Sequence, residues 1–320
     1  MPTPMIAAIC AVIGFLVSAI TGPIFIPLLR KLKFGQQILE EGPNWHKSKA
    51  GTPTMGGIIF ILAVLVVSAI FVRDLKGLFV VLFALSCGLI GFLDDYIKVV
   101  KKRNLGLSAM WKVILMLVVS TTFVVCGLEF GIIQTTLWIP FTHIYLDLSY
   151  YISILLVFMM IGFINAVNLT DGVDGLASSV TFVVSLFFTL ASMIFLSEGM
   201  TMFSAGLCGA LCGFLIYNLH PAKVFMGDTG SLFLGGAVAS LAILNDMPLI
   251  LLIVGIVYLI EALSVMLQVT YFKLTKGKRI FKMTPIHHHF EMSGYSENKI
   301  VLLFSAITLL GCVIAYLSRV

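Results

Sequence analysis

Charged residues are scarce in this 320-residue chain. Asp, Glu, Lys and Arg together make up 11% of it, whereas an average soluble domain contains about 25%. Apolar residues make up 60%. A soluble fold of this size must cover its surface with polar and charged groups, which this composition lacks. The composition therefore excludes a soluble enzyme, a disordered chain and a nucleic-acid-binding protein, and it predicts an all-α polytopic membrane protein.

Cysteine is also scarce, and none of the six residues has the spacing of a CxxC motif or of a Cys/His metal site. We interpret them as small apolar packing residues, because all lie within or at the ends of apolar runs: Cys10, Cys87, Cys126, Cys208, Cys212 and Cys312. The first apolar run, 5–29, lacks a basic residue before it and exceeds the about 7–15 residues of a signal-peptide core. We interpret it as a retained span.

Ten apolar runs have about the length that a transmembrane helix requires. We predict a single membrane domain over residues 1–320, with spans at 5–30, 53–72, 77–97, 110–127, 149–166, 175–196, 201–218, 230–245, 248–271 and 299–318. Of the 20 Lys and Arg residues, only Arg73, Lys76 and Arg319 fall outside one set of loops. The positive-inside rule predicts that this set is cytoplasmic and that both termini are extracytoplasmic. We expect segment 128–148 to form a small hairpin on the outer surface.

The string LDDYIK places two adjacent acids at the cytoplasmic end of the third predicted span. A helix C-terminus disfavours carboxylates by a few tenths of a kcal/mol, and Asp94 and Asp95 also repel each other. Lys98, three and four residues further on, can offset part of this. An ordinary stop-transfer boundary would need only the lysines. Paired carboxylates at a membrane surface suit a hard divalent cation bound together with substrate phosphates.

Two further strings, NLTDGVDGL and NLHPAKVFMGDTGS, place acids in glycine-bracketed turns before predicted spans. Asn168, Asp171 and Asp174 lie in the first, and Asp228 lies in the second. Helix N-caps explain such residues equally well. Phe225, an aromatic residue in a polar loop, could stack on a base.

The last two strings, KMTPIHHHFE and GPNWHKSKAGTPTMGG, are rich in histidine and in hydroxyl-bearing or basic residues, respectively. Three consecutive histidines cannot all face one ligand. A solvated loop or an adventitious metal site is one interpretation, and contacts of His287, His288 or His289 with anionic oxygens are the other. The second string is a candidate phosphate clamp, with Lys49 and Thr54. Glu261 lies inside the ninth predicted span, where ionisable residues are functional by default. A role in helix packing explains it equally well, and the sequence assigns it no partner.

All five strings fall on the predicted cytoplasmic face, which makes that face the candidate site. The strings GTPTMGG, LDDYIK, NLTDGVDGL, VFMGDTGS and PIHHHFE, in this order and over essentially the whole chain, resemble the motifs of the polyprenyl-phosphate N-acetylhexosamine-1-phosphate transferase superfamily. Within it the chain is similar to the phospho-N-acetylmuramoyl-pentapeptide transferase family, because PIHHHFE and GTPTMGG separate that family from relatives that use UDP-N-acetylglucosamine.

The resemblance implies a Mg²⁺-dependent enzyme of the bacterial plasma membrane that acts in peptidoglycan synthesis. Its substrates would be undecaprenyl phosphate and UDP-N-acetylmuramoyl-pentapeptide, its products lipid I and UMP, and its assembly a homodimer. Asp94 and Asp95 would lie near the lipid phosphate, Asp228 would bind the metal, Asp174 would lie near the uridine and Phe225 would stack on the uracil. Lys98 and His287 would be catalytic together with Asp94, Asp95 and Asp228. The remaining residues predicted to bind substrate are Lys49, Thr54, Lys112, Asn168, Asp171, Asn218, His288 and His289.

Three alternatives stay open at this point. A sister transferase for N-acetylglucosamine 1-phosphate would share the aspartate strings. A secondary transporter would instead place its ionisable residues near the bilayer midplane. Within the transferase interpretation, direct attack by the lipid phosphate is favoured because a phosphate monoester, with a second pKa of about 6, is mostly dianionic at neutral pH. A two-step route through an aspartyl phosphate remains possible.

Overall fold

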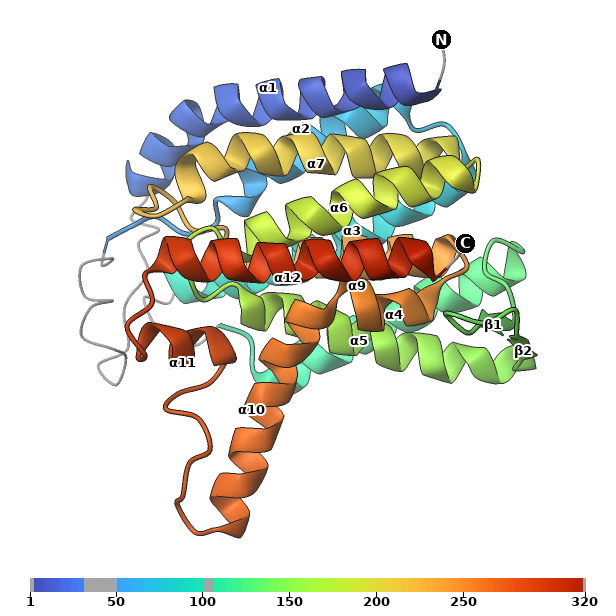
Figure 1. Ribbon diagram of the computed structural model, residues 1–320. Coiled ribbons are helices and arrows are strands. Elements are labelled where there is room, and N and C mark those ends of the chain that lie inside the picture. Colours follow the sequence, from blue (N-terminus) through green and yellow to red (C-terminus); the bar gives the residue numbers. More distant parts are fainter. Residues whose placement is uncertain (1–2, 32–50, 101–105, 319–320) are drawn as a thin grey trace.

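The computed structural model describes residues 3–31, 51–100 and 106–318 as a bundle of long apolar helices (Figure 1). In chain order the elements are α1 (Thr3–Lys31), α2 (Gly57–Phe71), α3 (Leu75–Val100), α4 (Ala109–Glu129), β1 (Thr136–Trp138), β2 (Tyr145–Asp147), the 3₁₀ turn η2 (Ser149–Tyr151), α5 (Ile152–Thr170), α6 (Leu176–Ile194), α7 (Glu198–Asn218), α8 (Gly227–Leu244), the 3₁₀ turn η3 (Pro248–Ile250), α9 (Leu251–Val254), α10 (Ile256–Leu274), α11 (Ile286–Glu291) and α12 (Glu297–Leu317).

Nine helices within these ranges are long and apolar enough to cross a membrane. The remaining predicted span, 53–72, corresponds to α2, which has 15 residues and is shorter than the about 20 that a full crossing takes. The ninth predicted span, 248–271, is wrong as a single helix, because the chain breaks at Gly255 between α9 and α10. A side chain there would lie 2.7 Å from the ring of Phe163. Beyond this break α10 leaves the bundle at a steep angle (Figure 1).

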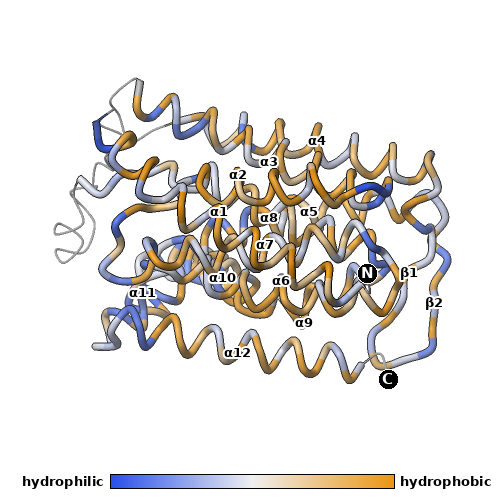
Figure 2. The backbone as a smooth tube through the Cα atoms, turned by 90° about the horizontal axis from the view of Figure 1, so that it is seen from above, coloured by the Kyte–Doolittle hydropathy of each residue, from blue (hydrophilic) through white to orange (hydrophobic). Residues whose placement is uncertain are grey.

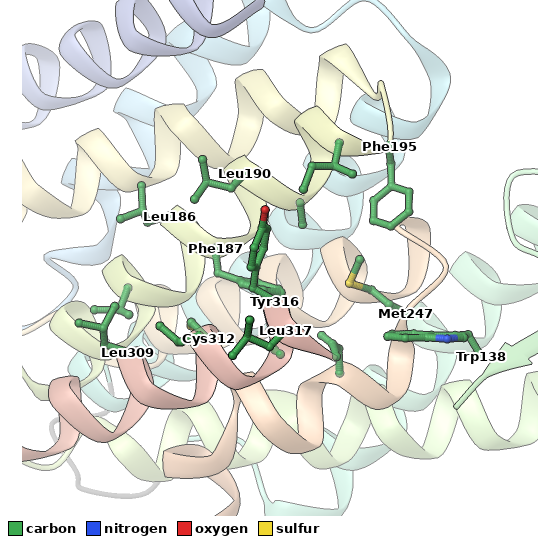
Figure 3. A pocket seen from close by; sticks show the side chains of 16 residues that line it. Trp138, Leu186, Phe187, Leu190, Phe195, Met247, Leu309, Cys312, Tyr316 and Leu317 are labelled. Atoms are coloured by element: carbon green, nitrogen blue, oxygen red, sulfur yellow. The ribbon is translucent and has the colours of Figure 1, made fainter. Parts of the chain in front are cut away.

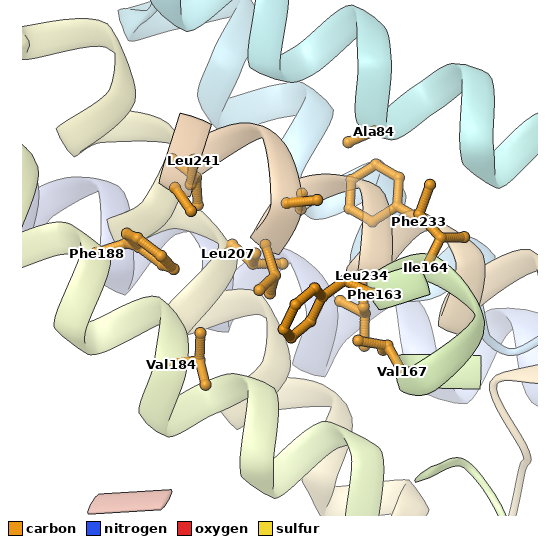
Figure 4. Close-up of a cluster of buried hydrophobic side chains, with 14 of the residues drawn as sticks. Ala84, Phe163, Ile164, Val167, Val184, Phe188, Leu207, Phe233, Leu234 and Leu241 are labelled. Carbon is orange, nitrogen blue, oxygen red and sulfur yellow. The ribbon is translucent and has the colours of Figure 1, made fainter. Parts of the chain in front are cut away.

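The core is centred on α7 and α8, the most buried of the long helices. α7 packs against α1, α2 and α6, and α8 packs against α3 and α5. Small residues permit this close packing; a Cβ on Gly209 of α7, for example, would lie 1.8 Å from the carbonyl oxygen of Ala11 in α1. Figure 4 shows the resulting apolar interior, where Phe163, Phe188 and Phe233 come from three different helices.

The two ends of the bundle differ in polarity. Hydrophilic residues gather where α11 lies, together with the C-terminal ends of α3 and α5 (Figure 2); this is the polar end. The start of α1 and the end of α12 lie at the opposite end, which also carries β1 and β2. The predicted hairpin is confirmed, since β1 pairs antiparallel with β2. The start of α1 and the end of α12 therefore lie at the same end of the bundle.

A pocket of about 560 Å³ lies at the end that carries the termini, between α6 and α12 (Figure 3). Trp138, Phe187, Met247 and Leu317 are among its lining residues, which are almost entirely apolar. Such a lining suits hydrocarbon and offers little chemistry. The ionisable groups that could carry a reaction lie at the polar end instead.

Candidate active site

Three carboxylates come together at the polar end where α3 meets α8. Asp94 and Asp95 lie near the end of α3, and Asp228 lies in the first turn of α8. One oxygen of each lies within 4.8 Å of one from each of the others. Gly91 permits this approach, because a Cβ there would lie 2.0 Å from the carbonyl oxygen of Asp228. Acids separated by more than 130 positions thus form one cluster, as the sequence predicts for a shared site.

Asp95 caps the N-terminus of α8. Its carboxylate accepts hydrogen bonds from the backbone N–H of Asp228 (3.3 Å) and of Thr229 (2.9 Å), and from the Thr229 hydroxyl (2.7 Å). The first N–H groups of a helix lack internal partners and carry partial positive charge, so a carboxylate satisfies them well. Asp95 is 2% exposed, so it fixes the position of Asp228 as well as belonging to the cluster.

Two lysines offset most of the negative charge of the cluster. The Lys98 Nζ lies 2.6 Å from an oxygen of Asp94 and 2.9 Å from Asp228 Oδ2. The Lys112 Nζ, which comes from α4, lies 2.7 Å from the same Asp228 oxygen and 3.2 Å from Asp94 Oδ1. Both ammonium groups therefore bridge the same two carboxylates, which keeps like charges together at short range.

Neighbouring polar groups complete the first cluster. The Asn168 amide, at the end of α5, donates to Asp228 Oδ1 (2.9 Å) and to the Ser231 hydroxyl (2.7 Å). The loop before α2 runs beside the loop before α8, because the N–H of Phe225 donates to Pro53 O and the N–H of Gly56 donates to Phe225 O. Thr54 lies in this loop pair, next to Gly227 and the Asp95 carboxylate. The loop that contains Phe225 therefore packs against the loop that brings Thr54 close to Asp95.

A second cluster, which the sequence did not predict as a unit, surrounds Asp174. Its carboxylate accepts from the N–H of Ala222 (3.0 Å) and lies 3.1 Å from His220 Nδ1. That imidazole nitrogen also lies 3.1 Å from Glu297 at the start of α12. His220 stands in the same string as Asp228, so the string contained a signal for it, whereas Glu297 lies 123 positions beyond Asp174 and has no local signal. Asn218 nearby holds Ser178 and the carbonyl of Val224.

Asp171 lies between the two clusters, in the 171–175 turn that joins α5 to α6. Desolvation by its surroundings raises the pKa of this carboxyl to about 8, and the negative charges of Asp228, Asp95 and Asp174 act in the same direction. The group is therefore mostly protonated at neutral pH and can donate a hydrogen bond, which an ionised carboxylate cannot do.

The three histidines of α11 face different partners, as predicted. His287 is fully buried, with Nδ1 3.0 Å from the carboxylate of Glu261 in α10. His288 Nδ1 lies 2.6 Å from Glu291, and His289 Nδ1 accepts from the N–H of Lys282 (3.2 Å). The structure thus supplies the partner that the sequence could not assign to Glu261. Because His287 has no exposed surface, it contacts a substrate only if its neighbours move. Lys49 lies outside the described residues.

Comparison with known proteins agrees with this geometry. The profile described as glycosyl transferase family 4 matches residues 77–246, and the phospho-N-acetylmuramoyl-pentapeptide-transferase signature 1 matches residues 49–61. A phospho-N-acetylmuramoyl-pentapeptide-transferase of Carboxydothermus hydrogenoformans is 49% identical over 95% of both chains. Proteins of the same name from Caldicellulosiruptor bescii and Clostridium perfringens strain 13 are 48% and 50% identical over 95% and 96% of this chain, and over 94% and 96% of their own length. With its apolar spans, this multi-pass membrane protein therefore belongs to the phospho-N-acetylmuramoyl-pentapeptide transferase family.

Proposed function

We propose that this chain transfers phospho-N-acetylmuramoyl-pentapeptide from UDP-N-acetylmuramoyl-pentapeptide to undecaprenyl phosphate at the cluster of Asp94, Asp95 and Asp228. The products are lipid I and UMP. The observation that carries the proposal is the convergence of three carboxylates and two lysines at one end of a bundle of apolar helices. The family of the chain supports the same reaction.

The position of the cluster suits the two substrates. A polyprenyl phosphate cannot leave the bilayer, and a charged nucleotide sugar cannot enter it, so only a site at the boundary between water and lipid can meet both. The carboxylates lie at the end of long apolar helices rather than at their middle. We assign this end to the cytoplasmic face of the bacterial plasma membrane, because the sequence assigns all but three of the 20 Lys and Arg residues to the loops of this side.

The cluster also fits a magnesium ion. Mg²⁺ takes hard oxygen ligands, usually one or two carboxylates together with substrate phosphates, and three carboxylates here offer oxygens within 4.8 Å of one another. Asp228 would hold the ion, with Asp94 and Asp95 beside it. Asp95 already accepts three hydrogen bonds from α8, which leaves Asp94 and Asp228 as the better donors. When bound, the ion would neutralise charge on the diphosphate oxygens.

Lys98 and Lys112 supply the other positive charges that would stabilise the substrate phosphates. Each ammonium group lies within 3.2 Å of both Asp94 and Asp228, and is thereby held ready to turn from a carboxylate to a phosphate oxygen. An oxygen of the lipid phosphate attacks the sugar-bearing phosphorus, the bond from that phosphorus to the bridging oxygen breaks, and UMP leaves. Since the attacking phosphate is already largely dianionic, the aspartates position lysines and ion rather than remove a proton.

A transferase assay tests the proposal. The purified protein is mixed with both substrates, with and without Mg²⁺, and UMP release is measured. We expect UMP and lipid I with Mg²⁺, and a loss of about 10²-fold or more in kcat for Asp228→Asn, since this replacement removes a carboxylate charge that both lysines contact and that would hold the ion. Asp147→Asn is the matched control, because Asp147 lies in the hairpin at the other end and accepts the N–H of Ser149, which an amide oxygen also accepts.

Several outcomes would refute the proposal. Release of UMP from UDP-N-acetylglucosamine at a rate similar to that with the muramoyl substrate would favour the sister transferase. A wild-type rate for Asp228→Asn would remove that carboxylate from the site. A radiolabelled phospho-enzyme formed from the nucleotide sugar alone would replace direct attack with the two-step route.

A further inference from the structure

A buried acid and a buried imidazole face each other behind the candidate site. Glu261, in the membrane-spanning helix α10, and His287, in α11, are both 0% exposed. Glu261 Oε2 lies 3.0 Å from His287 Nδ1 and accepts the backbone N–H of the same residue at 3.4 Å. A carboxylate buried in an apolar helix is costly unless it is paired. The single partner of the Glu261 carboxylate among the described residues is His287. A pair that is retained despite the cost of burial is a candidate for a functional role.

The far edge of the imidazole packs against Gly172. A Cβ on Gly172 would lie 2.2 Å from His287 Nε2 and 2.6 Å from Cε1, so no side chain fits between ring and backbone. His287 Nε2 has no hydrogen-bond partner in the described part of the chain. Its contact with this turn is therefore one of shape rather than of hydrogen bonding. Gly172 belongs to the 171–175 turn, which carries Asp171 and Asp174.

The same turn is held on another side by polar contacts. Asp174 accepts the N–H of Ala222 and lies beside His220, and its own N–H donates to Glu297 (3.1 Å). The turn is thus clamped between the Asp174 contacts and the His287 ring. If Glu261 no longer fixed that ring, Gly172 would lose one wall of the clamp, and both acids of the turn would shift with it.

We propose that Glu261 is a positioning residue: it fixes the imidazole of His287, and the imidazole fixes the 171–175 turn and with it Asp171 and Asp174. The identity of the ligand that this turn contacts, the nucleotide sugar, rests on the proposed function. The contact of Glu261, His287 and Gly172 itself does not depend on that function. The reacting phosphates belong to the other cluster, so loosening the turn should weaken nucleotide binding more than it slows the transfer.

Steady-state kinetics of three variants test this role. Glu261→Ala should raise the KM for UDP-N-acetylmuramoyl-pentapeptide about tenfold or more, as expected for the loss of a hydrogen bond to a charged group, with kcat within about threefold of wild type. Glu261→Gln should stay within about threefold in both constants, because its amide oxygen can accept the same backbone N–H and lie against the same imidazole nitrogen. Ser264→Ala is the matched control on α10, since its buried hydroxyl donates to the backbone carbonyl of Glu261 (2.7 Å) rather than to the carboxylate.

The opposite pattern would overturn the proposal. A Glu261→Gln variant as impaired as Glu261→Ala, with the loss in kcat, would mean that the charge itself takes part in the reaction. A Glu261→Ala variant with wild-type KM would mean that the Glu261–His287 pair does not position the 171–175 turn for nucleotide binding. If Glu261→Ala is not recovered as folded protein, Gly172→Ala tests the same contact from the other side and should raise the KM similarly. Gly162→Ala is its control, because a Cβ at Gly162 meets nothing within 4 Å.

Hydrogen exchange separates this inference from the proposed function. In substrate-free protein, the backbone amides of residues 171–176 should exchange about tenfold faster in Glu261→Ala than in wild type, and at the wild-type rate in Ser264→Ala. If the wild-type protein transferred nothing, the proposed function would fail while the exchange experiment still reported on the clamp. Unchanged exchange in Glu261→Ala would overturn the clamp whatever the activity.

Discussion

Thr229 offers a sharp test of the way in which α3 and α8 are joined. Its hydroxyl donates to Asp95 Oδ2 at 2.7 Å, and its backbone N–H donates to the same oxygen. Thr229→Val keeps the shape of the side chain and the N–H but removes the hydroxyl. Asp95 is 2% exposed, so water cannot replace the lost donor. A hydrogen bond to a charged group contributes about 1.5–3 kcal/mol, and we expect the free energy of unfolding to fall by that amount.

The corresponding change in melting temperature can be worked out. An unfolding entropy of about 2.1 cal/mol/K per residue gives about 0.7 kcal/mol/K for a chain of 320 residues. Thr229→Val should therefore melt about 2–4 °C below wild type in the same detergent. Thr229→Ser keeps the hydroxyl and should recover most of the difference. The reasoning is refuted if the valine variant melts with the wild type, or if the serine variant melts with the valine variant.

Three further predictions follow from the same region. Gly91→Ala would place a Cβ 2.0 Å from the carbonyl oxygen of Asp228, and overpacking of this kind costs about 1–3 kcal/mol; the melting temperature should fall, whereas Gly162→Ala should not lower it. Burial raises the pKa of Asp171 to about 8, from about 3.9 in the unfolded chain. The folded state therefore binds this proton more tightly than the unfolded state does, and the free energy of unfolding should decline as the pH rises from about 4 to about 8. Asp171→Asn should flatten this decline in thermal melts, and a variant with the wild-type slope would contradict the assignment. Lys112→Met removes one of the two ammonium groups beside Asp228, so UMP release should slow by about 10²-fold or more while the Mg²⁺ concentration for half-maximal rate falls; a variant with wild-type kcat would contradict the role of this lysine.

The helices were predictable because hydropathy acts within each segment. A run of apolar residues that is long enough to span hydrocarbon must satisfy its backbone groups internally, and a helix does so. Each predicted span therefore corresponds to helical structure. The break at Gly255 was not predictable in this way, because the run 248–271 is apolar on both sides of it. What singles out Gly255 is its packing against Phe163 of α5, a contact that hydropathy does not report.

The partners of the site residues were less predictable than the residues themselves. Glu261 and His287 both stand out in the sequence, the first as an acid within a span and the second as part of a histidine run. Neither string indicates that the two face each other, because a pairing between α10 and α11 depends on how the chain returns to the bundle. The same holds for Glu297 and Asp174, which are 123 positions apart. Composition identifies costly groups, and only tertiary structure shows what stabilises them.

The charges of the first cluster explain how one site can attract both a cation and phosphates. Asp94, Asp95 and Asp228 face the two ammonium groups of Lys98 and Lys112. With all five groups charged, the cluster carries one net negative charge and attracts a divalent cation. Once such an ion is bound, the net charge is positive by one, and the cluster attracts phosphate instead. The Asp95 carboxylate already accepts hydrogen bonds from the N-terminus of α8. The cation would therefore bind mainly to Asp94 and Asp228, the two carboxylates that contact both lysines, and the net charge around these two would change from negative to positive. An order of binding follows, in which the ion precedes or accompanies the diphosphate, and nucleotide affinity measured without Mg²⁺ should be the weaker.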